Sequence, residues 1–260
     1  MEKPRHLGPQ YGAQFGDASV VAAYRFRPPY PEQVLDMLAG LMVGGSGKIL
    51  DAGCGSGDLA LPLLQIAERI DAVDPSAAML ATGRARLGGD DPRVRWIAGR
   101  MEDVPLDPPY ALVTTGESLH WMDWPVVIRR FRELLVPGGH LAIVNRVEQR
   151  NPWAGELQRL IDRYSTNRDY QRYDLIQELE QRGLFRTIGE QRTELVHFSQ
   201  SVGDYVESIH SRNGFSRDRM TPDSAAEFDR AAGELLERYA TNGAVTLQIS
   251  GSIVWGEPIA

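Results

Sequence analysis

Three glycines and two acidic side chains stand close together in the first part of the chain, at a spacing that suits nucleoside binding. Gly53, Gly55 and Gly57 follow an apolar run that ends at Asp51, and Asp74 closes the next apolar run. Glycines after a strand allow a tight turn and a close approach of the backbone to a ligand. The turn alone would also fit a strand–helix connection without a ligand. Because Asp74 lies about 20 residues beyond the first glycine, where an acid can accept ribose hydroxyls, a nucleoside site is favoured.

The residue at position 58 narrows the class of ligand. A dinucleotide fingerprint would have a small residue there, but the chain has Asp58. A carboxylate at the start of a helix opposes the binding of a pyrophosphate, and the sequence lacks the Lys-Ser/Thr pair of a phosphate-binding loop. A ligand with a ribose, no phosphate and a positively charged end fits better. S-adenosylmethionine, which carries a sulfonium and an amino group, meets these conditions.

Alternating strand and helix patterns place the glycine turn in a parallel sheet. Short apolar runs predict strands at residues 48–52, 70–73, 94–98, 112–115 and 141–144. Periodic apolar patterns predict helices between them at residues 59–67, 77–87 and 126–135. This alternation implies right-handed crossovers, with helices on both faces of the sheet.

Helical patterns predominate after residue 150. Helices are predicted at residues 153–164, 175–182, 202–211 and 225–239. Strands are predicted at residues 193–198 and 244–255, and the absence of short crossovers between them favours antiparallel pairing at a sheet edge. No linker is long enough to separate a second domain, so we expect one domain over residues 1–260.

The composition is that of a globular protein. Hydrophobic residues make up 42% of the 260 residues and charged residues 24%, which excludes wholesale disorder. No apolar run reaches the ~20 residues of a membrane span, and the first residues lack the apolar stretch of a signal peptide. A single cysteine can form neither an internal disulfide nor a structural zinc site. We therefore expect a cytoplasmic protein without a metal or a membrane partner, and the net charge of −7 disfavours nucleic acid as a partner.

Four segments resemble, in order, the class I S-adenosylmethionine-dependent methyltransferases, in the small-molecule branch that includes trans-aconitate and natural-product methyltransferases. They are LDAGCGSG at residues 50–57, VDPS at 73–76, GRMEDVPL at 99–106, and LHWMD followed by ELLVPGG within 119–139. Residues 15–31 also match that branch. The resemblance implies a Rossmann-like α/β fold with a mostly parallel seven-stranded sheet, helices on both faces and a helical insertion over the pocket. It further implies an N-terminal helical lid (1–47), a cofactor-binding core (48–146), and a substrate-covering part with antiparallel edge strands (147–260).

The resemblance implies where S-adenosylmethionine, and its product S-adenosylhomocysteine, would lie. Asp51 and the turn at residues 53–57 would hold the methionine amino end, and Asp74 would accept both ribose hydroxyls. The other implied cofactor contacts are Tyr24 and Arg27 at the carboxylate, Pro75, Ser76 and Met79 along the adenine, Met101 and Glu102 at its edge, and the backbone of Thr115 and Gly116 beside the methyl. The implied turn contacts are Gly53, Cys54, Gly55 and Gly57.

Two side chains after the predicted fourth strand are candidates for proton transfer. His120 could act as a general base on a hydroxyl, amine or acidic carbon, and Glu117, three residues earlier, is an alternative acceptor. His120 could instead only line the pocket wall, and Glu117 could be a solvated carboxylate of the loop. The candidates for contact with the acceptor are Tyr11, Tyr30, Trp121 and His210.

The sequence therefore predicts an enzyme that moves a methyl group to O, N or C of a small-molecule acceptor, in secondary metabolism. Other chemistry with the same cofactor, such as aminopropyl transfer, and a non-enzymatic cofactor-binding protein remain as alternatives. The tetrapeptide DPPY at residues 107–110 also occurs in adenine-N6 methyltransferases of DNA, but here it precedes the fourth strand instead of following it. We interpret it as a turn.

Overall fold

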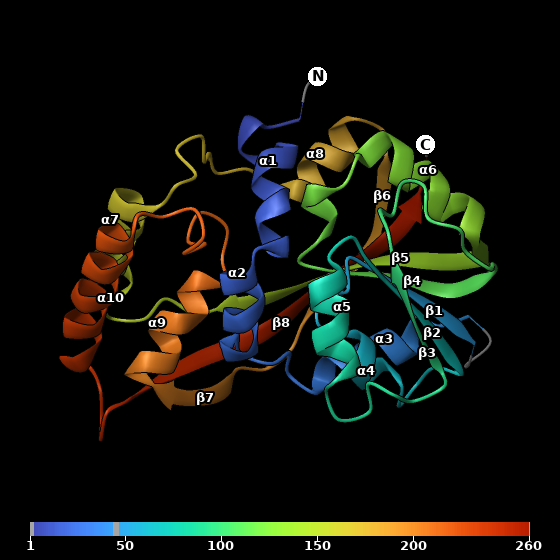
Figure 1. Cartoon of the computed structure of the whole chain (residues 1–260). Helices are drawn as coiled ribbons and strands as arrows, with labels where there is room; N and C mark the ends of the chain where they lie inside the picture. Colours follow the sequence, from blue (N-terminus) through green and yellow to red (C-terminus); the bar gives the residue numbers. More distant parts are fainter. Residues whose placement is uncertain (1–2, 44–46, 260) are drawn as a thin grey trace.

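The sheet and its helices are seen in a computed structural model that describes residues 3–43 and 47–259. Within these residues, eight strands form one sheet in the order β3-β2-β1-β4-β5-β8-β6, and β7 pairs with another part of β8. Figure 1 shows helices on both sides of the sheet and a helical lobe beside it. The predicted α/β class and mostly parallel sheet are confirmed, with one strand more than the seven expected.

Five parallel strands carry the glycine turn and the loops that face it. They are β1 (Lys48–Ala52), β2 (Arg69–Asp74), β3 (Val94–Ala98), β4 (Tyr110–Gly116) and β5 (Leu135–Glu148). Neighbours pair in parallel register, for example Ile49 with Ile70 and Leu50 with Val113. The predicted bounds of β1 and β3 are confirmed, whereas β5 runs on past Val144 to Glu148. The DPPY segment leads into β4 as irregular backbone and not as the turn that was predicted, and its Tyr110 is the fully buried first residue of the strand.

Alternation along these strands explains why both faces are covered. Leu50 and Val113 face one core with α6 (Trp124–Leu134) and α8 (Leu175–Gln181). Ile49 and Leu112 face the opposite core. Its helices are α3 (Gln33–Gly40), α4 (Ala60–Leu63) and α5 (Ala77–Arg84). Both α4 and α5 are shorter than the predicted helices.

The antiparallel part of the sheet is larger than predicted. β8 (Ala244–Pro258) pairs with β5 on one side, and with β6 (Phe185–Arg192) and β7 (Val196–Ser201) on the other. The predicted strand at 193–198 is shifted, and β6 was missed. β6 is an edge strand with mostly exposed side chains, so its sequence lacks the apolar alternation of a half-buried strand.

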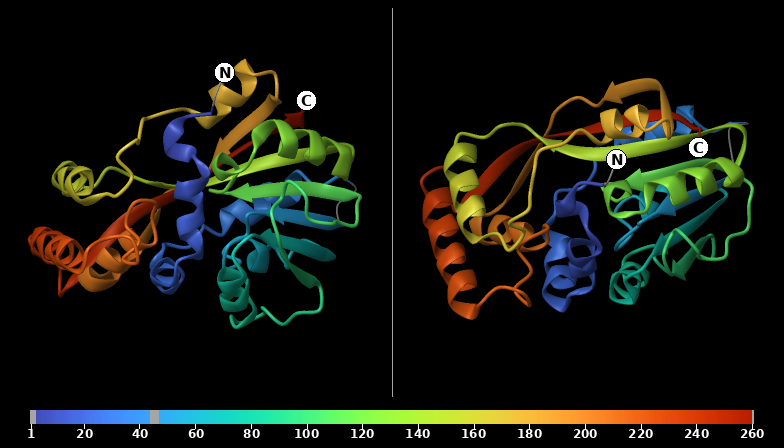
Figure 2. Two further views of the ribbon diagram at one scale, coloured as in Figure 1. Left: turned by 45° about the horizontal axis from the view of Figure 1, so that its top comes forward. Right: turned by 90° about the horizontal axis from the view of Figure 1, so that it is seen from above.

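A helical lobe stands beside the sheet, as Figure 2 shows from two directions. It consists of α7 (Ala154–Tyr164), α9 (Val202–His210) and α10 (Pro222–Glu237), packed on the first half of β8. The N-terminal helices α1 (Pro9–Gly12) and α2 (Ala18–Ala23) lie between the lobe and the parallel strands. A space enclosed by sheet, lobe and N-terminal segment results.

The described residues contain neither a membrane-spanning helix nor a cluster of metal ligands. Within 3–43 and 47–259, no helix combines the length and the apolar composition that a membrane crossing requires. Over the same residues, no three His, Cys, Asp or Glu side chains gather in a way that could hold a metal ion.

Candidate functional site

A cleft of about 1750 Å³ opens where the parallel strands end, between the sheet, the N-terminal segment and the helical lobe. Ligands of open α/β sheets bind outside the carboxyl ends of the strands. The volume exceeds the roughly 300–1,000 Å³ that is usual for small-molecule pockets. The space is therefore large enough for two ligands side by side.

The glycine turn after β1 forms the floor of this cleft. Gly53 has a φ of 73° and Gly55 a φ of 54°, a region that glycine enters without steric cost. The amides of Gly53 and Cys54 donate to the Val73 carbonyl at 2.8 and 2.9 Å, which ties the turn to β2. A Cβ on Gly53 would lie 2.4 Å from the Cβ of Ser118, so the loop after β4 presses directly against the turn.

Asp74 lies at the end of β2 with its carboxylate in the cleft wall. One carboxylate oxygen accepts the Gly55 amide at 2.9 Å and the other accepts the Ser76 amide at 2.8 Å. Burial raises the pKa of Asp74, and these two amides oppose that rise. Each oxygen keeps a lone pair for a further donor, so the carboxylate is oriented as an acceptor of two hydroxyls.

The side chains predicted to surround an adenine lie together next to Asp74. Pro75, Ser76 and Met79 line the cleft from the start of α5, and Met101 and Glu102 line it from the loop after β3. Glu102 accepts the Asp123 amide at 2.8 Å, and the Arg100 guanidinium approaches its other oxygen at 3.4 Å.

Four residues predicted to bind the cofactor do not line the cleft: Asp51, Cys54, Gly57 and Thr115. Asp51 is buried beneath the turn, and its carboxylate accepts the Thr114 hydroxyl at 3.0 Å. Burial raises the pKa of Asp51 to about 7. If Asp51 helps to hold the methionine amino end of the cofactor, it would therefore do so by supporting the glycine turn and not by direct contact.

Asp58 also points away from the cleft. Its carboxylate is bound by Arg86 and lies 3.3 Å from Nη1 of Arg146. Two guanidinium groups offset the charge of Asp58, so its carboxylate would not repel a pyrophosphate as the sequence suggested. Asp58 therefore does not distinguish S-adenosylmethionine from a dinucleotide.

Arg27 and Tyr24 reach the cleft from the N-terminal segment. The Arg27 guanidinium stacks on the Tyr24 ring, with its carbon 4.2 Å from the ring centroid. It also donates to the hydroxyl and carbonyl of Ser211 at 2.8 and 2.7 Å, just beyond α9. Arg27 thus connects the lobe to the wall of the cleft.

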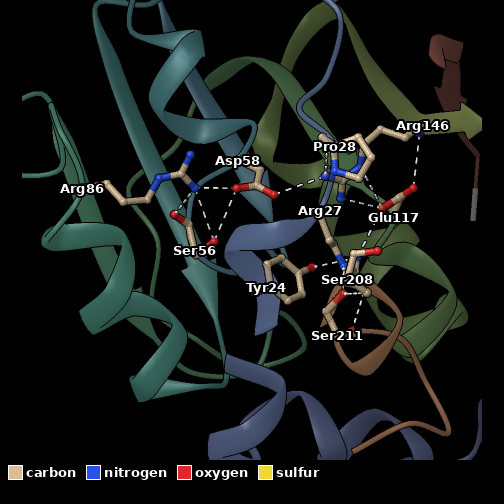
Figure 3. Close-up of polar contacts among 10 residues, drawn as sticks. All are labelled: Tyr24, Arg27, Pro28, Ser56, Asp58, Arg86, Glu117, Arg146, Ser208 and Ser211. Carbon is tan, nitrogen blue, oxygen red and sulfur yellow. Dashed lines mark hydrogen bonds and ion pairs between the residues drawn. The ribbon is translucent and has the colours of Figure 1, made fainter. Parts of the chain in front are cut away.

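Glu117 lines the cleft but is not a free carboxylate (Figure 3). One of its oxygens accepts Nη2 of Arg146 at 2.7 Å and Nε at 3.2 Å, and lies 3.4 Å from Nη1 of Arg27. Burial alone would raise the pKa of Glu117, but the two arginines outweigh it and hold the pKa below its usual value. Glu117 is thus a poor proton acceptor.

His120 faces the cleft from the short 3₁₀ turn after β4, and its neighbour Trp121 also lines it. The two ring centroids are 4.7 Å apart. Burial lowers the pKa of His120 to about 4, against a smaller rise from Glu117. The imidazole is therefore neutral at pH 7 and can accept a proton, as a weak base.

Three residues predicted to contact the acceptor do not line the cleft. Tyr11 donates its hydroxyl to Asp169 at 2.8 Å. Tyr30 packs under the Arg146 guanidinium, 4.6 Å from its ring centroid. His210 is fully buried in the lobe, with its ring nitrogens 2.8 Å from the Phe215 carbonyl and 2.6 Å from Asp229. The structure therefore corrects these predictions: Tyr11 is engaged by the loop after α7, His210 by the lobe, and Tyr30 by Arg146 of β5, and none of the three lines the cleft.

Several residues of the cleft were not predicted from the sequence. They include Lys3, Phe15, Asn145, Arg146, Tyr173 and Arg212. The signal for Arg146 was its position two residues beyond an apolar run that was expected to end at Val144. The others come from segments whose path over the sheet is set by tertiary packing, and no local pattern marks them.

Comparisons with known proteins agree with this geometry. Residues 49–139 match a family described as a methyltransferase domain. Uncharacterized methyltransferases of Mycobacterium tuberculosis and Mycobacterium bovis are 34% identical over 148 residues, a match that covers 56% of this chain and 58% of each relative. A malonyl-[acyl-carrier protein] O-methyltransferase of Pectobacterium atrosepticum is 32% identical over 110 residues, which is 41% of this chain and 42% of that protein. The chain thus spans little more than half the length of the mycobacterial relatives.

Solved structures extend the likeness in fold. A candidate type II methyltransferase from Anaeromyxobacter dehalogenans has a TM-score of 0.63 and 25% identity, covering 89% of this chain and 97% of that one. The [4+2]-cyclase SpnF has a TM-score of 0.52 and 23% identity, covering 88% and 82%. Residues 49–139 thus match a methyltransferase domain, and the chain has the Rossmann-like fold of the class I S-adenosylmethionine-dependent methyltransferases over most of its length.

Proposed function

We propose that this protein transfers a methyl group from S-adenosylmethionine to an oxygen, nitrogen or carbon atom of a small-molecule acceptor. The observation that carries the proposal is the Asp74 carboxylate, fixed by the amides of Gly55 and Ser76 at the edge of the cleft. It presents two oriented acceptors beside a glycine turn, as ribose recognition requires.

With the ribose bound at Asp74, the positions of the adenine and of the methionine part would follow. Pro75, Met79 and Met101 would flank the adenine, and Glu102 would meet its edge. Arg27, already cationic and close to the turn, would face the carboxylate of the methionine part, whereas the backbone of Gly116 would lie beside the methyl group. S-adenosylmethionine supplies the electrophilic methyl, and the residues of the chain bind and orient it.

A small acceptor suits the remaining part of the cleft. The volume of about 1750 Å³ leaves room beyond a nucleoside, and this room is lined by His120, Trp121, Asn145 and Arg212. The DPPY segment lies outside the cleft lining, and the net charge of −7 disfavours a polyanionic acceptor. We therefore place the acceptor among small molecules, including those of secondary metabolism, and not among nucleic acids.

Alignment of the two reactants would supply most of the rate acceleration. Holding a nucleophile in line with the methyl group can contribute about 7–11 kcal/mol. We assign the acceptor's proton to His120, because its imidazole is neutral and faces the cleft, whereas Glu117 is engaged by two guanidinium groups. With its low pKa, His120 suits a nucleophile that is itself acidic or that releases its proton as the new bond forms.

The experiment that tests this function is mass spectrometry of a metabolite panel incubated with the purified protein and S-adenosylmethionine. The expected result is one compound that gains the mass of a CH₂ group while S-adenosylhomocysteine accumulates. Consumption of the cofactor with a different mass change would favour other chemistry on this fold, as the name of the SpnF cyclase illustrates for that protein. No product over a broad panel, together with no cofactor binding, would contradict the proposal.

A further inference from the structure

Arg146, near the end of β5, joins three separate segments of the cleft wall (Figure 3). Its Nη1 donates to the Pro28 carbonyl at 2.7 Å and lies 3.3 Å from the Asp58 carboxylate. Its Nη2 and Nε donate to Glu117 at 2.7 and 3.2 Å. One guanidinium thus touches the N-terminal segment, the start of the first crossover and the loop after β4.

The side chain of Arg146 is enclosed and fully engaged. It is 8% exposed, and its guanidinium stacks on the Tyr30 ring at 4.6 Å. The planar fork of an arginine fixes the directions of its donors, so the positions of Pro28, Asp58 and Glu117 are set relative to one another. Each of the three guanidinium nitrogens of Arg146 already has a partner within the protein.

Glu117, one of these partners, combines a left-handed backbone conformation with several hydrogen bonds. Its φ is 52°, a left-handed conformation that is strained for a residue other than glycine. Its amide donates to the Val144 carbonyl at 3.0 Å, and its carboxylate also accepts the Arg146 amide at 3.3 Å. The same residue follows Gly116, whose backbone lies beside the position expected for the methyl group.

Asp58 connects Arg146 to the other side of the cofactor. Its carboxylate is shared between Arg146 and Arg86, and Arg86 also donates to the Ser56 carbonyl in the glycine turn at 3.0 Å. A continuous series of hydrogen bonds and ion pairs therefore runs from the glycine turn through Arg86, Asp58 and Arg146 to the loop after β4. Arg27 extends it to the lobe through Ser211.

We propose that Arg146 is a positioning residue: through Glu117 and Asp58 it holds the loop after β4 and the glycine turn at the separation that the cofactor requires. The inference rests on the proposed function, since it takes S-adenosylmethionine as the ligand of the cleft. Loss of the fork would leave the two loops joined only by the contact between Gly53 and Ser118 and the Ser118–Ala52 hydrogen bond. The cofactor would then have to order the rest of both loops on binding.

The test uses the full chain, S-adenosylhomocysteine as the probe, and isothermal titration calorimetry. Arg146→Lys keeps the charge, but a compact ammonium cannot reach all three partners. We expect it to weaken binding by about tenfold or more. Arg238→Lys is the matched control, because Arg238 forms an ion pair with Glu156 on the outside of the lobe; its affinity should equal that of the wild type.

Double variants separate positioning from general loss of stability. If Arg146 acts through Asp58 and Glu117, Asp58→Asn and Glu117→Gln should weaken binding less in the Arg146→Lys background than alone. Full additivity, or an Arg146→Lys variant that binds as tightly as the wild type, would overturn the inference and leave the proposed function intact. A wild-type protein that binds no S-adenosylhomocysteine would overturn the proposed function, and the inference with it.

The pH dependence of binding gives a readout that a purely structural role would not change. In Arg146→Met, burial of Glu117 is opposed only by Arg27 and by the main-chain amide of residue 146; the other neighbours Tyr24, Tyr30 and His120 are neutral at pH 7. The pKa of Glu117 should therefore rise. As the pH is lowered, binding of S-adenosylhomocysteine should begin to weaken at a higher pH in Arg146→Met than in the wild type. Protonation of Asp74 should affect binding equally in the two proteins. Adding Glu117→Gln to both should abolish the difference between their pH profiles. An acid limb that does not move would contradict the role of Glu117.

Discussion

At the scale of single residues, the structure separates two side chains that sequence spacing could not rank. Glu117 and His120 lie three residues apart and both line the cleft. The carboxylate is bound by Arg146 and Arg27, which come from β5 and the N-terminal segment, and this pairing lowers its pKa. The imidazole has a pKa of about 4 because of burial. We therefore propose proton transfer as a role for His120, and we place Glu117 in the wall of the cleft.

The first prediction concerns this histidine. His120→Ala should lower turnover of the acceptor found in the metabolite panel by about 10²–10⁴-fold, the usual contribution of a general base. Its affinity for S-adenosylhomocysteine should stay near that of the wild type, because the ribose and adenine contacts come from other loops. A base with a pKa of about 4 is active above that pH, so wild-type turnover should be flat from pH 6 to 8. An acid limb near the ordinary histidine pKa of about 6.5, or near-normal turnover of His120→Ala, would contradict the assignment.

At the scale of elements, contact between two loops defines the cleft floor. The glycine turn after β1 and the loop after β4 touch at Gly53 and Ser118, and the Ser118 hydroxyl donates to the Ala52 carbonyl at 2.6 Å. Neither element leaves space for a side chain at Gly53. Its positive φ adds a second reason for glycine.

The second prediction separates these two reasons. Gly53→Ala should lower the melting temperature and weaken S-adenosylhomocysteine binding, since the new Cβ meets Ser118 at 2.4 Å and φ is 73°. Gly88→Ala is the control: its φ is 78°, but nothing lies within 4 Å of the added carbon. It should show only the backbone cost of about 1–2 kcal/mol and bind the ligand normally. Equal effects of both substitutions on binding would show that loop contact is unimportant.

The parallel core and the ribose-side residues could be predicted because their signals are local. β1 and β3 are short apolar runs with predicted bounds that the structure confirms. Asp74 was found from its distance to the glycine turn. β6 was missed because Phe185 is its only buried residue, and an exposed edge strand carries no apolar alternation. Arg146 and the inward-facing part of the N-terminal segment depend on contacts between distant residues, which spacing does not encode.

At the scale of the whole molecule, folding buries a carboxylate beneath the cleft floor, where its charged form is unfavourable. Asp51 is 1% exposed, and desolvation, only partly opposed by the Thr114 hydroxyl, raises its pKa to about 7. The ordinary pKa of an aspartate is about 3.9. Because the folded state then binds this proton more tightly than the unfolded state, the free energy of unfolding falls as pH rises from about 4 to about 7, and is constant above.

The third prediction follows from this sign. Asp51→Asn keeps the shape and an acceptor for Thr114 but removes the charge, so it should be more stable than the wild type. The advantage should grow by about 2 kcal/mol between pH 5 and pH 8. Urea denaturation at both pH values measures it. An advantage that is the same at pH 5 and pH 8, or a loss of stability, would show that the Asp51 carboxylate is not held in its neutral form.

The central claim is that the cleft binds S-adenosylmethionine through the Asp74 carboxylate. Calorimetric titration with S-adenosylhomocysteine and with NAD, on the wild type and on Asp74→Ala, tests it most directly. We expect micromolar binding of S-adenosylhomocysteine and no binding of NAD. In Asp74→Ala the affinity for S-adenosylhomocysteine should fall at least about tenfold, since each bond to a charged group contributes about 1.5–3 kcal/mol. Thermal melting of the variant checks that its fold is retained. Tight binding of NAD, or unchanged affinity for S-adenosylhomocysteine in a folded Asp74→Ala protein, would contradict the account.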